Sequence, residues 1–389
     1  MARKFKHHSL TGRITAELLL TSFHAVRRNR GAAGLDRVSI AMFERNLEPN
    51  LASLLHHLKR RGLYQSKPLR RHFIPKAGSS ELRPLGIPAV RDRVAQEVLR
   101  QLLNPIFEPL FHDSSFGFRP ARNCHQAIEQ VLQLKEEGYI FVVDADIKGF
   151  FDSIDHELIV DAVAAEVADG NILHIIRQFL QSGVMEDGAL KPTPKGTPQG
   201  GVISPLLANI VLNHLDWQLQ SKGLRFVRYA DDFVVMCKTA AEAEEALAFI
   251  RHVIEGQLKL QLHPEKTRIT RFSKGFEFLG FAIAANRCSM RPKAQGNFKL
   301  KIKDLTRRSC NLDAQVILKL NRVIRGTTNY FATSFSDVKF LFREFDKFIR
   351  RRLRCMKFKR ISRQDNYRLR NRQLARLGLL SARALCGPC

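Results

Sequence analysis

The sequence predicts an α+β fold, in which a mixed body of helices and short antiparallel strands is followed by a helical C-terminal segment. Apolar residues recur at helical spacing in several stretches, for example across residues 40–61. Short apolar runs bounded by turn residues indicate strands, as on either side of the acidic turn at 231–232. Hydrophobic residues make up 44% of the 389 positions, which is enough for a packed core in two or three domains.

The first part of the chain combines helices with one hairpin. The turn sequence Ala77-Gly-Ser-Ser80 separates two extended stretches, so it predicts a hairpin that joins 72–75 to 82–88. Apolar periodicity, ended by glycine or asparagine at the breaks, predicts helices over about 13–28, 40–61, 92–103 and 121–137.

The middle of the chain alternates strands and helices. The stretch 139–147 is apolar and β-branched apart from its acids, which predicts a buried strand. Two further strands, 224–230 and 233–237, flank the acidic turn. The remaining elements of this body are expected to be helices over about 156–168, 171–182, 204–221 and 240–256, a strand at 267–271 and a strand pair around 276–284.

The C-terminal part is helical and strongly basic. Beyond residue 299 apolar residues form a single stripe with Arg and Lys on the opposite face, which is typical of an amphipathic helix. Residues 281–389 contain 27 of the 64 Lys and Arg residues, against six acids, whereas the first 280 residues are nearly neutral. This asymmetry indicates a catalytic body and an extension that binds a polyanion such as nucleic acid. A solvated basic surface without a ligand is the alternative.

Membrane insertion and secretion are not expected. No apolar run approaches the ~20 residues that span a bilayer, and the basic start lacks a signal peptide's apolar core. The seven cysteines are scattered without framework spacing, which fits a reducing cytosol.

Acidic residues stand at the ends of two predicted strands. Asp231 and Asp232 are adjacent in a turn, and Asp144 and Asp146 share one face of the strand at 139–147. If these strands are neighbours, their oxygen ligands would select Mg²⁺ or Mn²⁺. Two such ions are the standard device for in-line phosphoryl transfer. The alternative is that each Asp only caps a strand or forms a turn.

Several motifs occur in a fixed order between about Asn29 and Arg376. They are Arg30-Gly-Ala-Ala-Gly-Leu-Asp36, the stretch 74–88, Phe116-Gly-Phe-Arg-Pro120, the stretch 146–156, Gly196-Thr-Pro-Gln-Gly-Gly, Tyr229-Ala-Asp-Asp232, His263-Pro-Glu-Lys-Thr267, Phe278-Leu-Gly-Phe281 and Arg325-Gly-Thr-Thr-Asn-Tyr330. Together these motifs resemble a reverse transcriptase of the group II intron (maturase) type.

The resemblance implies a right-hand polymerase fold, with fingers and a palm built from an antiparallel sheet plus helices, followed by an α-helical thumb. It predicts the N-terminal extension and fingers at 1–130, the palm with the catalytic carboxylates at 131–285, and the thumb or maturase domain at 286–362. Residues 363–389 are expected to be a short basic tail from a truncated DNA-binding region, with no endonuclease domain.

The resemblance also implies site residues. Asp146, Asp231 and Asp232 would be catalytic and would bind metal, together with the backbone carbonyl of Ile147. Asp144, Asp152 and Asp155 are expected to be structural, as an edge acid, a turn former and a helix cap. Substrate contacts are expected from Lys76, Arg83, Phe151, Gln199 and Lys266. Nucleic-acid contacts are expected from Arg350, Arg351, Arg352, Arg354 and Lys357.

By this resemblance the chain is expected to be an RNA-directed DNA polymerase that uses two Mg²⁺ ions, or Mn²⁺, to extend a DNA primer on an RNA template with dNTPs. It would also bind its group II intron RNA to aid splicing and retrohoming, in the bacterial cytosol or at the nucleoid, without a membrane partner. Two alternatives stay open: an RNA-binding splicing cofactor with dispensable polymerase activity, and a domesticated relative in DNA repair or phage defence.

Overall fold

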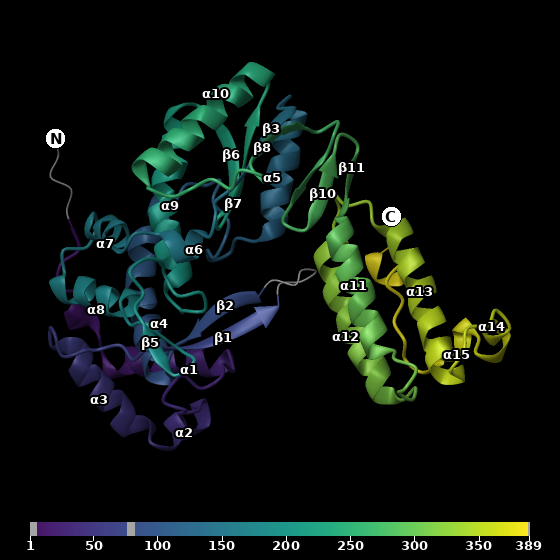
Figure 1. The fold of residues 1–389 in the computed structure, drawn as a ribbon, viewed down its shortest axis with the longest axis horizontal. Coiled ribbons are helices and arrows are strands. Elements are labelled where there is room, and N and C mark those ends of the chain that lie inside the picture. The colour runs from purple at the N-terminus through teal and green to yellow at the C-terminus, as the bar shows by residue number, and fades with distance from the viewer. Residues whose placement is uncertain (1–5, 76–81, 388–389) are drawn as a thin grey trace. The chain divides into compact units, whose positions relative to one another are not determined.

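The computed structural model describes residues 6–75 and 82–387 (Figure 1). The chain divides into two compact units, an N-terminal unit that extends to Ile269 and a C-terminal unit that begins at Thr270. This boundary precedes residue 285, where the palm was expected to end. Both units combine helices with antiparallel strands, which confirms the predicted α+β class. No helix in the described ranges has the length and apolar character needed to cross a bilayer.

The helices of the N-terminal unit follow the predicted order with one break. The helix expected over 40–61 is two helices, because Asn46 leaves the helical region (φ −120°, ψ 46°) between them. Asn50 Nδ2 donates to the Phe43 carbonyl across this break at 3.0 Å. The helices are α1 Ala16–Arg28, α2 Ile40–Arg45, α3 Leu47–Lys59, α4 Val90–Phe107, α5 Cys124–Glu136, α6 Phe150–Ser153, α7 His156–Ala164, α8 Gly170–Leu180, α9 Ser204–Ser221 and α10 Ala240–Arg251.

Two four-stranded sheets belong mainly to this unit. The first has the order β2-β1-β4-β5, and β1 and β2 form the predicted antiparallel hairpin, whose turn lies outside the described residues. The β4–β5 hairpin was not predicted, because its strands have only three residues each. The strands are β1 Leu69–Pro75, β2 Leu82–Ile87, β4 Val184–Glu186 and β5 Ala189–Lys191.

The second sheet carries the acidic strand ends. Its order is β6-β7-β3-β8, and β7 pairs antiparallel with both β6 and β3. The strands are β3 Phe141–Asp146, β6 Arg225–Tyr229, β7 Asp232–Cys237 and β8 Arg268–Arg271.

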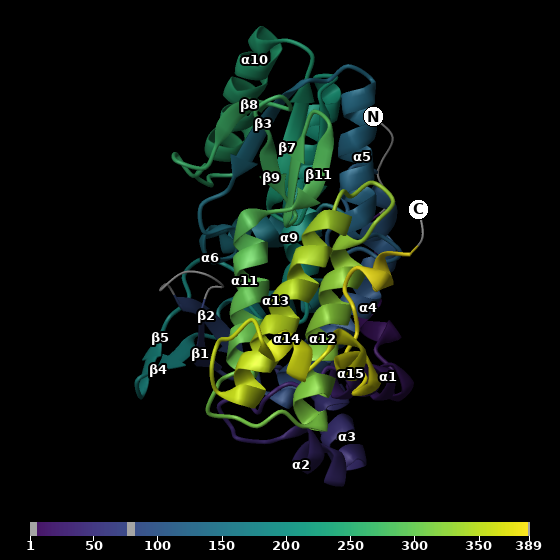
Figure 2. The same cartoon turned by 90° about the vertical axis from the view of Figure 1, so that its right-hand side faces the viewer.

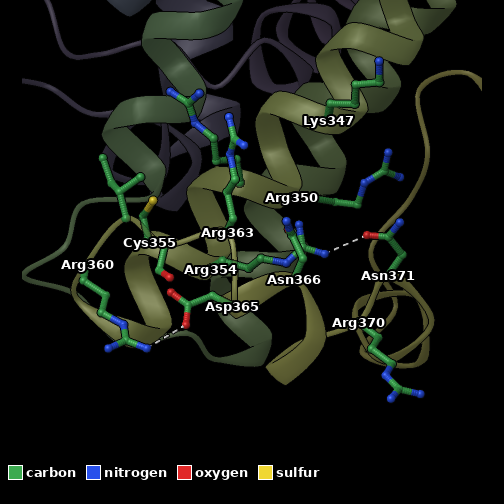
Figure 3. Close-up of a pocket in the computed structure, with 13 residues that line it drawn as sticks. Lys347, Arg350, Arg354, Cys355, Arg360, Arg363, Asp365, Asn366, Arg370 and Asn371 are labelled. Carbon is green, nitrogen blue, oxygen red and sulfur yellow. Dashed lines mark hydrogen bonds and ion pairs between the residues drawn. The ribbon is translucent and has the colours of Figure 1, made fainter.

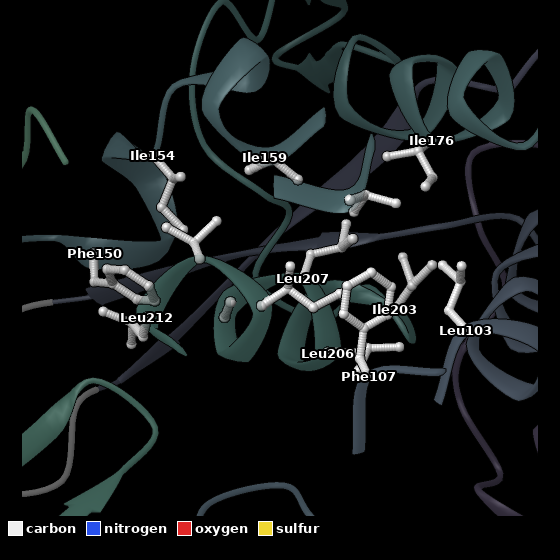
Figure 4. Packing of buried hydrophobic residues seen from close by; sticks show 14 of the residues in the cluster. Leu103, Phe107, Phe150, Ile154, Ile159, Ile176, Ile203, Leu206, Leu207 and Leu212 are labelled. Carbon is white, nitrogen blue, oxygen red and sulfur yellow. The ribbon is translucent and has the colours of Figure 1, made fainter. Parts of the chain in front are cut away.

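Helix α9 lies in the core of the N-terminal unit. Its residues Leu207, Leu212 and Leu215 are fully buried, and α4 and α7 both pack against it. Figure 4 shows Leu207 and Leu212 among apolar side chains of the surrounding helices. Each fully buried leucine stabilises the fold by roughly 1.5–3 kcal/mol. The same helix carries the buried polar residues Asn209 and Asp216, which are thereby held in fixed positions.

The C-terminal unit is a small sheet followed by helices. Its sheet has the order β11-β10-β9, and Figure 2 shows α11, α13 and α12 side by side. The chain after α13 folds back on it, since the buried Asp346 accepts hydrogen bonds from Ser381 Oγ and Ala382 N at 2.6 and 2.8 Å. The elements are β9 Phe276–Phe278, β10 Phe281–Ala284, β11 Arg287–Met290, α11 Pro292–Leu305, α12 Ala314–Phe331, α13 Lys339–Phe358, α14 Asp365–Arg368 and α15 Asn371–Arg376.

Candidate active site

The strand pairing brings the predicted acids to one edge of the second sheet. Asp146, the last residue of β3, lies directly opposite Asp232, the first residue of β7. Asp231 precedes Asp232 in the tight turn from β6 to β7. The carboxylates at positions 146, 231 and 232 therefore lie at the same end of two neighbouring strands. The predicted metal site required these strands to be neighbours, and β3 and β7 are paired.

The turn that carries Asp231 has a strained backbone and a close neighbour. Ala230 adopts a left-handed conformation with φ 59°, which is uncommon for a residue with a side chain. Gly117 packs against this turn so closely that a Cβ on it would lie 2.3 Å from the Ala230 nitrogen. The glycine of the motif Phe116-Gly-Phe-Arg-Pro120 is therefore required by the approach of its backbone to the acidic turn.

A buried hydrogen-bond network around Arg228 holds the acidic turn in place. Arg228, with no exposed surface, donates from Nε and Nη2 to the two carboxylate oxygens of Asp216 on α9, at 2.7 and 2.5 Å. Its Nη1 donates to Asn209 Oδ1 at 3.0 Å and to the Ala230 carbonyl at 2.9 Å. Asn209 in turn donates to the Gly117 carbonyl at 2.8 Å. Arg228 thus ties the acidic turn to the buried helix α9.

The surroundings of this edge raise the pKa of one of its carboxylates. Burial raises the pKa of Asp231 above its usual value, and the negative charge of Asp146 raises it further. Asp146 itself forms an ion pair with Lys266, whose Nζ lies 2.9 Å from Asp146 Oδ2. Lys266 is therefore beside the acids, where it could act on a leaving group.

The donor set fits a divalent cation of the Mg²⁺ type. The described residues contain no group of three or more His, Cys, Asp or Glu side chains already gathered to hold a metal. Oxygen ligands from two adjacent strand ends, one of them with a raised pKa, are what a hard divalent ion would stabilise.

One residue predicted to contact the nucleotide, Arg83, interacts electrostatically with this edge. Burial raises the pKa values of both Asp152 and Asp231, and the positive charge of Arg83, which is exposed on β2, partly offsets this increase. Lys76 falls outside the described residues. Phe151 is half-buried on α6, with its ring 5.3 Å from that of Phe150.

Gln199 connects the first sheet to α6. Its Nε2 donates to Asp152 Oδ2 at 2.9 Å, and its carbonyl accepts from the Gly86 amide of β2 at 3.0 Å. The loop that carries it is pinned by Thr197 N, which donates to the Phe151 carbonyl at 2.7 Å. Asp152 thus positions Gln199, a contact that its assignment as a turn former missed. Asp155 caps α7, as predicted, by accepting from Glu157 N.

The basic helix α13 divides into exposed and anchored arginines. Arg351 and Lys357 are exposed and Arg350 is half-buried. Arg352 instead donates to Thr306, at 3.1 Å to Oγ1 and 2.7 Å to the carbonyl. Arg354 is buried and donates from Nε to the Leu369 carbonyl at 2.9 Å and from Nη2 to Asn371 Oδ1 at 2.8 Å. These two arginines hold the unit together, a role that the sequence pattern did not reveal.

The fold and the acidic strand ends define the chain as a polymerase of the reverse transcriptase class. A family model described as "Reverse transcriptase (RNA-dependent DNA polymerase)" matches residues 74–283. A second, "Group II intron, maturase-specific domain", matches residues 296–376. The chain therefore belongs to the reverse transcriptases and carries a maturase-specific domain, which confirms the family resemblance. Members of this family act on nucleic acids and depend on divalent metal ions.

Individual relatives agree with this assignment. Over 292 residues the chain is 36% identical to Protein YkfC of Escherichia coli (strain K12), a match that covers 65% of this chain and 76% of YkfC. Over 376 residues it is 30% identical to the group II intron-encoded protein LtrA of Lactococcus lactis subsp. cremoris, covering 79% of this chain and 60% of LtrA. An uncharacterized 91 kDa protein in the cob intron of Schizosaccharomyces pombe is 40% identical over 149 residues, 38% of this chain and 18% of that protein.

Proposed function

We propose that the chain copies RNA into DNA by extending a primer with dNTPs, using two Mg²⁺ ions or Mn²⁺ held by Asp146, Asp231 and Asp232. The observation that carries the proposal is the cross-strand position of Asp146 opposite Asp232, with Asp231 in the adjoining turn. We expect the backbone carbonyl of Ile147, the residue after Asp146, to complete one metal site.

The protein's own residues would position the reactants. Two divalent cations at this edge would lower the pKa of the primer 3′-hydroxyl and stabilise the pyrophosphate that leaves. Arg83, and Lys76 near it in sequence, would bind the triphosphate by charge. Phe151 would exclude a ribose 2′-hydroxyl, and Gln199 would line the nucleotide pocket. Lys266, already paired with Asp146, would give a proton to the leaving pyrophosphate.

We further propose that the C-terminal unit binds group II intron RNA and assists its splicing and retrohoming. The match of residues 296–376 to the maturase-specific domain supports this, as does the excess of bases in this part of the chain. Arg350, Arg351 and Lys357 on α13 are the residues of the predicted set that remain available for RNA phosphates. Such a protein would work in the bacterial cytosol or at the nucleoid, where its RNA is made.

Primer extension on an RNA template tests the polymerase. Wild type should extend the primer with dNTPs and Mg²⁺, and Asp231→Asn should not. Asp155→Asn is the matched control, since asparagine caps a helix as well as aspartate does and Asp155 belongs to no proposed ligand set. Retained extension by Asp231→Asn would refute the assignment of the carboxylates. A folded wild type that binds RNA and supports splicing without extension would favour the splicing-cofactor function.

A further inference from the structure

The C-terminal unit contains a basic pocket, called here the arginine pocket. It is formed by the C-terminal half of α13 and the chain segment 360–371, and has a volume of about 740 Å³ (Figure 3). Its lining includes Arg350, Arg351 and Arg354 from α13, and Arg360, Arg363 and Arg370 from the segment. Lys347 adds a seventh cation, and Asp365 is the single carboxylate in the lining.

Most of this charge is not neutralised within the chain. Asp365 pairs with Arg360 at 3.2 Å, and Lys347 pairs with Glu344 at 2.7 Å. In the part of the chain that the structure describes, Arg350, Arg351, Arg363 and Arg370 have no carboxylate partner.

The cations also repel each other inside the pocket. Burial lowers the pKa of Arg354, and the positive charge of Arg350 lowers it further. Arg354 is nevertheless held in place by the Leu369 carbonyl and Asn371, so this charge cannot move away from its neighbour. A fixed, buried cation beside a second cation is stabilised by an anion between them.

One further feature distinguishes a nucleic acid from other anions. Tyr367 is 78% exposed on α14, and Ile361 in the pocket lining is 64% exposed. An exposed aromatic ring can stack on an unpaired base, and Tyr367 directly follows the lining residue Asn366 in the chain.

We propose that the arginine pocket binds an unpaired, sharply turned RNA segment, such as a loop or a bulge, with its phosphates among Arg350, Arg363 and Arg370 and a base on Tyr367. A straight duplex is convex and stiff, so it can touch the rim of a concave pocket but cannot enter it. A single-stranded turn can follow the wall and bring successive phosphates to successive arginines. The inference rests on the proposed function, because it specifies which RNA structure the maturase domain recognises.

The test compares two labelled RNAs of equal length, a hairpin with an unpaired loop and a fully paired duplex, by fluorescence anisotropy at several salt concentrations. The pocket variant is Arg350→Ala/Arg363→Ala, and both side chains lack a carboxylate partner in the described structure. The matched control is Arg322→Ala/Arg343→Ala, which removes two arginines outside the pocket lining. A thermal melt of each protein establishes that it is folded.

Wild type should prefer the hairpin, and the pocket variant should bind the hairpin about tenfold or more weakly while its duplex affinity changes little. Its salt dependence for the hairpin should also become shallower, by about 0.7 in the log–log slope for each phosphate that the variant no longer neutralises. The control should keep the hairpin preference. Equal binding of both RNAs by wild type, or a preference that survives in Arg350→Ala/Arg363→Ala, would overturn the proposal.

The binding assay contains neither dNTPs nor a primer, so it is independent of polymerisation. A wild type that extends primers but shows no hairpin preference would overturn the pocket and leave the polymerase intact. A wild type that prefers the hairpin but does not extend primers would support the pocket and contradict the polymerase. A second variant, Arg363→Ala/Arg370→Ala, repeats the test without altering α13 and should lose the same preference.

Discussion

Replacement of Arg228 by methionine should both destabilise the N-terminal unit and disable the acidic turn. Arg228→Met leaves Asp216 as a buried carboxylate without its counter-charge, since both side chains have no exposed surface. It also removes the donor to the Ala230 carbonyl, next to Asp231. Loss of one partner of a buried ion pair costs about 3–5 kcal/mol.

Urea unfolding followed by tryptophan fluorescence measures this effect directly. The chain has a single tryptophan, Trp217, which follows Asp216 on α9 and so reports on the N-terminal unit. The free energy of unfolding of Arg228→Met should fall by about 3–5 kcal/mol. In a thermal scan this corresponds to a lower Tm, by about 2–4 °C for each kcal/mol.

A double variant separates stability from positioning. Arg228→Met/Asp216→Leu removes the unpaired charge and should recover most of the stability, because buried ion pairs can be replaced by apolar residues at little cost. Primer extension should remain impaired in this variant, since nothing then holds the Ala230 carbonyl. A decrease below about 1 kcal/mol in Arg228→Met, or a double variant no more stable than the single one, would refute the role of the network.

Three further predictions concern the site itself. Phe151→Ala should raise the incorporation of rNTPs relative to dNTPs in a competition assay. An unchanged ratio would show that Phe151 does not exclude the ribose 2′-hydroxyl. Gln199→Ala should raise the KM for dNTPs by about tenfold with a smaller effect on kcat, because Gln199 is proposed to line the nucleotide pocket and one hydrogen bond there would contribute up to about 1.5 kcal/mol. An unchanged KM would exclude Gln199 from the nucleotide pocket. Mg²⁺ should raise the Tm of wild type but not of Asp231→Asn. This increase in Tm should become smaller as the pH falls, because protons compete with the cation for the carboxylate. Since the pKa of Asp231 is raised, the loss should begin at a pH above the usual carboxylate range. Equal stabilisation of both proteins by Mg²⁺ would contradict the metal site.

The parts of the fold that were predictable are those with a local signal. The strand pair around the acidic turn follows from apolar runs on both sides of Asp231 and Asp232, and α9 has the predicted bounds because Pro205 starts a long apolar stretch. The position of Asp146 opposite Asp232 could be predicted only on the condition that the strands are neighbours, and the register confirms that condition. Three-residue strands such as β4 and β5 are too short for such a signal.

The parts that were missed depend on contacts between distant segments. Arg228 looks like an ordinary polar residue in a strand, and no local pattern indicates that Asp216 and Asn209 on α9 will satisfy it. Helical periodicity predicts that Arg354 lies on the basic side of α13. It does not predict that the later segment around Leu369 folds over this side chain and buries it. The same segment creates the arginine pocket, so neither the buried arginine nor the pocket is visible in the sequence.

Single-nucleotide incorporation on an RNA template, measured over a series of Mg²⁺ concentrations, tests the central claim most directly. Wild type and Asp155→Asn should incorporate a dNTP at similar rates that rise with Mg²⁺. Asp146→Asn and Asp231→Asn should be slower by about a thousandfold or more, because each variant removes a carboxylate proposed to hold a metal ion, and such an ion would stabilise the transition state by several kcal/mol. Incorporation by Asp231→Asn at close to the wild-type rate, at the same Mg²⁺ concentration, would contradict the account.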